Sequence, residues 1–195
     1  MVFLRGQIEN RGGYDTMRPY RIEQIQSIKD FRTQKGITEF QAWKLLISIA
    51  ICQGMVLITG WFMAKSILTW YETLKKPSFT LPTLLVGLIY IILFALMGIA
   101  LYLIWRKSAM NSNVIFTLAI FFAQLSLNGV WVFVFFGLKF PLGGVFTIIP
   151  LWVFILITSL KFFIIDRIAG YLIIPYLIWV SYISIINAFI VRLNS

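Results

Sequence analysis

Amide and aromatic side chains recur at helical spacing within three long apolar stretches of this sequence. One series follows a single helical face at steps of four, three and four residues, and it consists of Gln124, Asn128, Trp131 and Phe135. A second series follows Pro175 at similar steps, and it consists of Tyr176, Trp179, Ile183 and Asn187. Tyr90 and Phe94 share a face of a third stretch. Polar side chains at membrane depth are costly and usually face the interior of a helix bundle, so we expect these faces to meet there.

Three such faces turned toward one another would line a cavity with aromatic walls and a few hydrogen-bonding groups. This is the usual composition of a site for a flat apolar ligand. The alternative is that the amides join helices and the rings fill the core, and spacing alone favours this alternative. Metal and acid–base chemistry have few groups to use here, because the sequence has no histidine and five of its seven carboxylates lie within the first 40 residues.

The composition indicates that a membrane surrounds these apolar stretches. The sequence is 60% hydrophobic and only 12% charged, far outside the shares of a soluble domain. Five stretches reach the ~20 residues that a helix needs to cross a bilayer, and they lie at about 42–66, 82–105, 114–136, 142–163 and 170–191. We therefore predict an all-α membrane protein in which residues 41–195 form a bundle of five transmembrane helices.

Residues 1–40 have the composition of a polar, basic N-terminal tail, in which Gly12, Gly13 and Pro19 should break any long helix. Apolar residues at 22, 25, 28 and 31 recur among basic ones, a pattern typical of a short helix in the membrane interface; a solvated or disordered tail is the alternative. The net charge of +10 suits anionic lipid head groups better than nucleic acid, so we expect a lipid membrane and no nucleic acid as partner. Lys and Arg near the helix ends number seven on the N-terminal side and five on the other, which favours an N-terminus inside.

Motifs in the order of a known family run from about residue 42 to the C-terminus. Residues 68–79 have the sequence LTWYETLKKPSF, and residues 95–106 have the sequence ALMGIALYLIWR. QLSLN at 124–128 is followed by Trp131 and by FFG at 135–137, and PYLIW at 175–179 is followed by Asn187. Five spans with these motifs in this order closely resemble the translocator protein family, also called the tryptophan-rich sensory or TspO/MBR proteins.

The resemblance implies a five-helix bundle, often dimeric, whose pocket beneath the first loop binds porphyrins, sterols and synthetic drug-like ligands. The matched lining positions are Trp70, Tyr71, Pro77, Asn128, Trp131 and Trp179. The predicted ligand site adds to these the positions found from spacing, which are Tyr90, Phe94, Gln124, Tyr176 and Asn187. We expect Trp179 and Tyr90 to face each other across this pocket.

The chain departs from the family pattern at four positions. Phe79 and Tyr90 each stand where the family usually has tryptophan, and Leu81 precedes Pro82 where the family has a pair of prolines. Thr147 matches a position that is acidic in some members. These changes keep the pocket aromatic and weigh against tryptophan-dependent chemistry on the ligand.

The predicted function is that of an integral membrane receptor or carrier. It would bind porphyrin-type tetrapyrroles, sterol-like or other flat hydrophobic ligands by stacking, with no catalytic residue, no metal and no cofactor other than the ligand. The alternatives are a light- or oxygen-dependent porphyrin-degrading enzyme, a membrane transporter of these ligands, and a scaffold whose tail recruits a partner. Without histidine to hold iron, metal-free protoporphyrin is the better ligand than haem.

Two further expectations concern location and assembly. A multi-pass protein of this kind is expected in a bacterial cell membrane, or in the mitochondrial outer membrane of a eukaryote. Small residues permit close helix contacts within or between chains, and they occur at Ala50, Gly54, Gly143 and Gly144. We therefore expect that the chain can form a homodimer.

Overall fold

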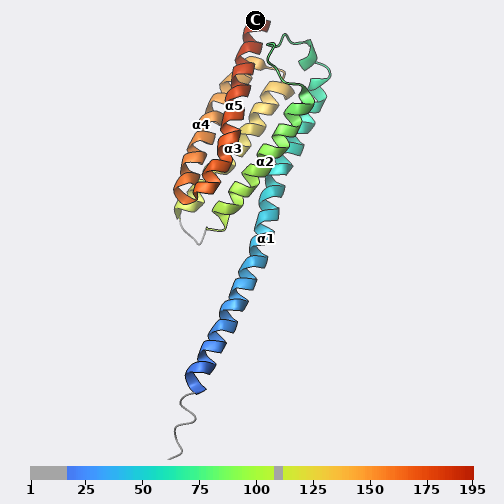
Figure 1. Cartoon of the computed structure of the whole chain (residues 1–195). Coiled ribbons are helices and arrows are strands. Elements are labelled where there is room, and N and C mark those ends of the chain that lie inside the picture. The colour runs from blue at the N-terminus through green and yellow to red at the C-terminus, as the bar shows by residue number, and fades with distance from the viewer. Residues whose placement is uncertain (1–16, 108–111) are drawn as a thin grey trace, which may run out of the picture. The chain divides into compact units, whose positions relative to one another are not determined.

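Five helices that are long and apolar enough to cross a membrane follow one another in the described part of the chain (Figure 1). The computed structural model describes the backbone of residues 17–107 and 112–195, and the side chains of residues 42–107 and 112–195. The helices are α1 (Met17–Ile67), α2 (Thr83–Trp105), α3 (Ser112–Val132), α4 (Pro141–Ile165) and α5 (Arg167–Asn194). A short 3-10 turn, η1 (Tyr71–Thr73), lies in the first loop, and a π-helical turn, η2 (Phe133–Gly137), follows α3.

The described residues contain helices and no strand. The spans predicted from hydropathy agree with the helices to within three residues at each end, once α3 is taken together with η2 and α1 is taken from Ala42, where its apolar part begins. The protein is therefore an all-α, multi-pass integral membrane protein with a bundle of five helices, as the sequence predicts.

Residues 1–43 and 44–195 form two separate compact units. In the first unit the described backbone is helical from Met17 onward, and Pro19 lies in the first turn of α1. Proline is tolerated in a first turn, so Pro19 does not break the helix that follows, contrary to the expectation from sequence. The side chains of the predicted interfacial segment, 22–31, lie outside the described residues, and its amphipathic role stays a prediction.

In the second unit, identifiable residues define several helix ends. Pro141 occupies the first turn of α4, where its missing N–H costs nothing. Asp166 separates α4 from α5 and caps α5, because its carboxylate accepts hydrogen bonds from the backbone N–H groups of Ile168 and Ala169 at 2.9 and 3.3 Å. The same carboxylate forms an ion pair with Lys107 at 2.8 Å. This contact joins the end of α2 to the turn between α4 and α5.

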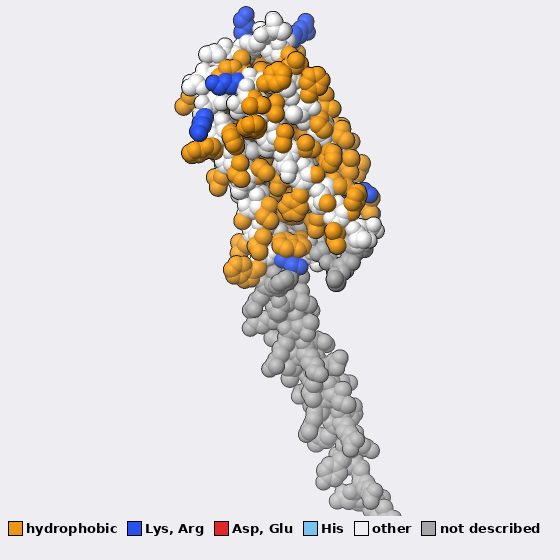
Figure 2. Space-filling view, turned by 180° about the vertical axis from the view of Figure 1, so that it is seen from behind, with side chains coloured by type: hydrophobic (Ala, Val, Ile, Leu, Met, Phe, Trp, Pro, Cys, Tyr) orange, Lys and Arg blue, Asp and Glu red, His pale blue; other side chains and the backbone are white. Residues whose placement is uncertain are grey.

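The outer surface of the bundle is apolar between its two ends. Hydrophobic side chains cover most of the face in Figure 2, and the few Lys and Arg side chains lie mainly toward its ends. Two lysines near opposite ends of the apolar part of α1 lie over tryptophan rings: Lys44 over Trp105 at 5.6 Å and Lys65 over Trp61 at 4.8 Å. Tryptophan and long cationic side chains are typical of the membrane–water interface, so these pairs mark where the head groups begin.

Aromatic rings and one close helix crossing hold the core of the bundle together. Phe121 of α3 stacks on Phe162 of α4 with ring centroids 5.7 Å apart, and Phe94 of α2 meets Tyr176 of α5 edge to face at 5.7 Å. Gly98 of α2 lies so close to α1 that an added Cβ would come within 2.8 Å of a backbone atom of Ile49. A side chain at this position would push α1 away from α2.

Candidate functional site: an aromatic cavity beneath the first loop

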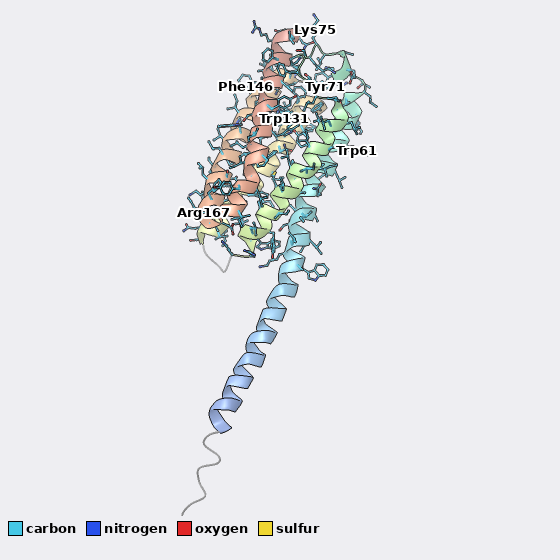
Figure 3. The ribbon with its side chains drawn as sticks, in the orientation of Figure 1. Trp61, Tyr71, Lys75, Trp131, Phe146 and Arg167 are labelled. Atoms are coloured by element: carbon cyan, nitrogen blue, oxygen red, sulfur yellow. The ribbon has the colours of Figure 1, made fainter. Side chains whose placement is uncertain are left out.

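A cavity lies at the end of the bundle that the first loop covers. Its internal volume is about 50 Å³, and the space between protein atoms reaches about 570 Å³ when its open mouth is included. Its walls come from α1, the first loop, α2, α3 with η2, and α5; the lining residues are Met63, Ile67, Tyr71, Thr80, Leu81, Thr83, Val86, Tyr90, Trp131, Phe135, Phe136, Ile183, Ile186, Asn187 and Ile190. Figure 3 shows two of them, Tyr71 and Trp131, toward the loop end of the bundle. The lining is mostly aliphatic and aromatic, with few polar groups.

The π-helical turn η2 forms the aromatic wall. Trp131 stacks on Phe135 with centroids 5.8 Å apart, and Phe135 and Phe136 are buried with their rings 4.8 Å apart. The turn is attached to α1 because the buried Ser66 hydroxyl donates a 2.6 Å hydrogen bond to the carbonyl of Phe136. A π-turn leaves the normal helical ladder and often occurs at functional sites. Here it presents two consecutive phenylalanines to the same cavity.

Two buried polar side chains in the lining have no hydrogen-bond partner among the described residues. Both amide atoms of Asn187 are unpaired although the side chain is 1% exposed, and the indole N–H of Trp131 is unpaired at 4% exposure. Gly144 of α4 makes room for Asn187 and for the Phe135 ring, since an added Cβ would come within 2.8 Å of the Asn187 amide nitrogen and 2.7 Å of the Phe135 ring. Such unpaired buried groups cost free energy, and a ligand that offers an acceptor or a donor would offset this cost.

The second half of the first loop is tied to α5 by hydrogen bonds. The Asn194 side chain accepts from the backbone N–H of Lys75 at 3.0 Å and donates to the carbonyl of the same residue at 2.9 Å. The Tyr182 hydroxyl donates to the carbonyl of Phe79 at 2.9 Å and accepts from the N–H of Leu81 at 3.3 Å. These bonds close the loop over the cavity from its aqueous side.

The first half of the loop rests on η2. Trp70 and Tyr71 meet the Phe135 ring edge to face at 5.7 and 6.3 Å. Lys76 lies over the Tyr71 ring at 4.4 Å and pairs with Glu72 at 3.4 Å. Burial, and to a lesser extent the charge of Glu72, raises the pKa of Tyr71 above its ordinary value, so its phenol is neutral at physiological pH and can donate a hydrogen bond.

The predicted site residues occupy two depths in the bundle. Four of them line the cavity, namely Tyr71, Tyr90, Trp131 and Asn187. Trp70 and Trp179 lie just outside this lining and touch it through ring contacts, while Pro77 belongs to the loop and does not line the cavity. The other four lie buried elsewhere in the bundle, outside the lining, and are Phe94, Gln124, Asn128 and Tyr176.

Three of the residues outside the lining, Gln124, Asn128 and Tyr176, are polar and buried in the core. The Asn128 amide donates to the Tyr176 hydroxyl at 2.9 Å, which joins α3 to α5. Gln124 is fully buried, and both of its amide atoms lack a partner among the described residues. For Asn128 and Tyr176 the geometry is that of a contact between helices, the structural alternative that the sequence leaves open.

Tyr90 and Trp179 are in contact and have no cavity between them. Their rings meet edge to face with centroids 5.9 Å apart. Tyr90 lines the cavity, and Trp179 lies behind it and also packs on Tyr182 at 5.3 Å. The expectation that the two rings face each other across the pocket is therefore replaced by a direct contact in which Trp179 supports Tyr90 and the loop-bonding tyrosine.

Sequence reasoning missed most of the aliphatic lining. On α5 the signal was present, since Ile183, Ile186, Asn187 and Ile190 continue one face at steps of three and four residues. The lining residues Thr80 and Leu81 come from the loop, whose path no periodicity describes. In the described residues no group of three His, Cys, Asp or Glu side chains could hold a metal ion.

The small residues expected to permit close contacts differ in their surroundings. Added Cβ atoms at Gly143 and Gly144 would meet Phe140 and Phe135 of the same chain, so these two glycines serve packing within the bundle. Gly54 has no neighbour within 4 Å of the position of a Cβ.

Comparison with known proteins identifies the family to which the sequence belongs. The sequence profile of the TspO/MBR family matches residues 48–193. The chain is 38% identical to the Tryptophan-rich protein TspO of Chlorobaculum tepidum, over 77% of this chain and 98% of that protein, and 36% identical to the protein of the same name from Archaeoglobus fulgidus, over 78% and 97%. It is also 27% identical to the human Translocator protein, over 65% of this chain and 76% of that protein. With its five spans and the motifs of its first loop and third and fifth helices, the chain belongs to the TspO/MBR family.

Proposed function

We propose that the protein is a membrane receptor or carrier that binds a flat hydrophobic ligand, of the porphyrin or sterol-like class, in the cavity beneath the first loop. The observation that carries this proposal is the pairing of aromatic walls with unpaired buried polar groups, Asn187 and the indole N–H of Trp131. The internal volume of about 50 Å³ is well below the ~300–1,000 Å³ of small-molecule sites, so a ligand of this class enters only when the loop and the helices around the cavity move apart. The names Translocator protein and Tryptophan-rich sensory protein, given to relatives, agree with carriage or sensing of a ligand.

Stacking explains how such a ligand would be held. The rings of Trp131, Phe135 and Tyr90 offer aromatic surfaces, and flat conjugated ligands gain free energy from contact with such rings. Binding then needs no axial ligand to iron, and the chain has no histidine to supply one. We propose metal-free protoporphyrin as the preferred tetrapyrrole and treat no residue as catalytic.

The first prediction tests this mode of binding. Purified protein titrated with metal-free protoporphyrin should bind it at least as tightly as haem, because stacking needs no iron. Both affinities can be measured from the ligand's own absorbance and from quenching of tryptophan fluorescence. Tight binding of haem alone, with the spectrum of a coordinated low-spin iron, would contradict the proposal.

Two tryptophan variants locate the site. Trp131→Leu should weaken protoporphyrin binding by about 1–3 kcal/mol, using the stacking of bases on aromatic rings as the analogue. The matched control is Trp61→Leu, because Trp61 is 65% exposed on the outer side of α1 (Figure 3). Equal losses in the two variants would place the ligand on the outer surface of the bundle.

A further inference from the structure

A second hollow lies between α1 and α2 and opens on the outer surface of the bundle. It contains about 830 Å³, including the space at its open side. Its lining is apolar except for threonines and Tyr90, and consists of Val56, Thr59, Gly60, Met63, Thr83, Leu84, Gly87, Leu88, Tyr90 and Ile91. Added Cβ atoms at Gly60 and Gly87 would meet no atom within 4 Å, so two helices that could pack tightly at these glycines leave a groove between them.

The groove occupies only the half of α1 and α2 that lies toward the loop. Farther from the loop the two helices are joined, because the Gln53 side chain donates to the carbonyl of Ile91 at 2.9 Å. Beyond this bond, one turn along α1 and two turns along α2, Ile49 meets Gly98 with no room for a side chain. Helices α1 and α2 are therefore in contact in the half that lies away from the loop and separate toward the loop.

The groove and the cavity share part of their walls. Met63, Thr83 and Tyr90 line both. The aqueous side of the cavity is covered by the first loop, which is tied to α5 through Asn194 and Tyr182. On the side between α1 and α2, the hydrogen bonds of the described residues include none that joins the two helices between Gln53 and the first loop.

We propose that the groove between α1 and α2 is the access route by which the hydrophobic ligand passes between the bilayer and the cavity, with Met63 and Tyr90 at the inner opening. This inference rests on the proposed function. A hydrophobic ligand partitions into the hydrocarbon, so it is concentrated on the side where the groove opens. The route avoids breaking the hydrogen bonds that hold the loop.

Filling the groove tests the route. Gly87→Phe places a ring in the groove, and Gly87 does not line the cavity. Stopped-flow measurement with metal-free protoporphyrin in phosphatidylcholine vesicles should show association and dissociation both slowed by about tenfold or more, with an unchanged dissociation constant, since a blocked route changes rates and not the bound state. The matched control is Gly54→Phe, which adds the same ring to α1 outside the groove.

Loosening the first loop tests the competing route, in which the ligand enters the cavity from water past this loop. Asn194→Ala removes both hydrogen bonds to Lys75, and it should not accelerate association. Acceleration by Asn194→Ala together with unchanged rates in Gly87→Phe would overturn the proposal in favour of access from water. A change in oligomeric state caused by Gly87→Phe, without a change in rates, would assign the groove to a second copy of the chain and would also overturn it.

A cysteine reporter separates failure of this inference from failure of the proposed function. In a Cys52→Ser background, Ile186→Cys places a thiol in the cavity wall of α5. A lipid-soluble maleimide should label it faster than a membrane-impermeant one, and Gly87→Phe should slow only the lipid-soluble reagent. This result is expected even if protoporphyrin does not bind. Faster labelling by the impermeant reagent would contradict the route whatever the ligand is.

Discussion

At the scale of single residues, unpaired buried polar groups occur both in the cavity lining, at Asn187 and Trp131, and deeper in the bundle, at Gln124. Asn187 is almost fully buried with both amide atoms unpaired among the described residues, whereas Asn128 at a deeper level bonds Tyr176. The two asparagines look alike in the sequence, since both lie on a periodic face. Their surroundings distinguish them: Asn128 joins two helices through its amide nitrogen, and Asn187 lines the cavity, where the proposed ligand would reach it.

Asn187→Leu is expected to separate stability from binding. Leucine has the same number and branching of side-chain heavy atoms and removes an unpaired amide, so the thermal midpoint of the free protein should rise. Binding of a ligand that bonds the amide should weaken by about 1 kcal/mol, the usual net value of one hydrogen bond. Circular dichroism melting and protoporphyrin titration on the same preparation measure both. A lower midpoint with unchanged affinity would make Asn187 a structural residue only.

The sequence predicted the cavity's position better than its walls. The residues of the third-helix and fifth-helix faces do approach one another, but depth decides which of them line the cavity: Trp131 and Asn187 do, and Gln124 and Tyr176 do not. That difference depends on where the helices separate beneath the loop. Helical periodicity carries no information about this separation.

At the scale of elements, helix ends and one irregular turn position the site. The end of α3 changes to a π-turn whose Phe136 carbonyl is bonded by Ser66, and hydropathy gives no signal for it because π- and α-helical residues are equally apolar here. The start of α5 is the opposite case. Asp166 is the one acidic residue between two apolar spans, and the cap that it forms could be expected from its type and place.

The cap of α5 should contribute measurably to stability. Asp166→Ala removes both the cap and the ion pair with Lys107, and it should cost about 1–2 kcal/mol. Asp166→Asn keeps a good capping residue and loses the ion pair, so it should cost less. Thermal unfolding followed by circular dichroism at neutral pH tests this order, and equal losses would mean that the ion pair is the only contributor.

The same carboxyl predicts a pH dependence with a definite sign. The hydrogen bond from Lys107 is the main cause that holds the pKa of Asp166 below its ordinary value. The stabilisation is therefore complete above the unfolded-state pKa of about 3.9 and is lost as the pH falls through the lower folded-state value. The difference in midpoint between the native protein and Asp166→Asn should disappear in that acidic range and stay constant above it.

At the scale of the whole molecule, the chain divides into the bundle and an N-terminal segment. Residues 1–43 and 44–195 form distinct compact units, and every cavity-lining residue belongs to the second. Five apolar spans could be read from hydropathy because a bilayer sets both their length and their composition. Before Ala42 the sequence offered only the helical spacing of apolar residues at 22, 25, 28 and 31, which indicates a short helix and does not show that the helical backbone continues into the first span.

Deleting residues 1–38 should therefore leave ligand affinity unchanged. The truncated protein retains all of the bundle, including the whole apolar part of α1. Protoporphyrin titration of the truncated and full-length proteins in the same detergent tests this, with helical content as the folding control. A large loss of affinity in a folded truncated protein would place the N-terminal segment in the site.

The lysines that lie over tryptophan rings at either end of α1 also fix the depth of the cavity. Lys44 and Lys65 are 21 residues apart, which is about 32 Å of helix and close to the ~30 Å of a hydrocarbon core. Met63 lies next to the Lys65 end, and Tyr90 lies seven residues into α2, roughly 10 Å from its start. The cavity and its groove therefore lie in a single leaflet, the one on the loop side. The protein would exchange ligand with that leaflet alone, and molecules confined to the opposite leaflet would reach the cavity only after flipping across the bilayer.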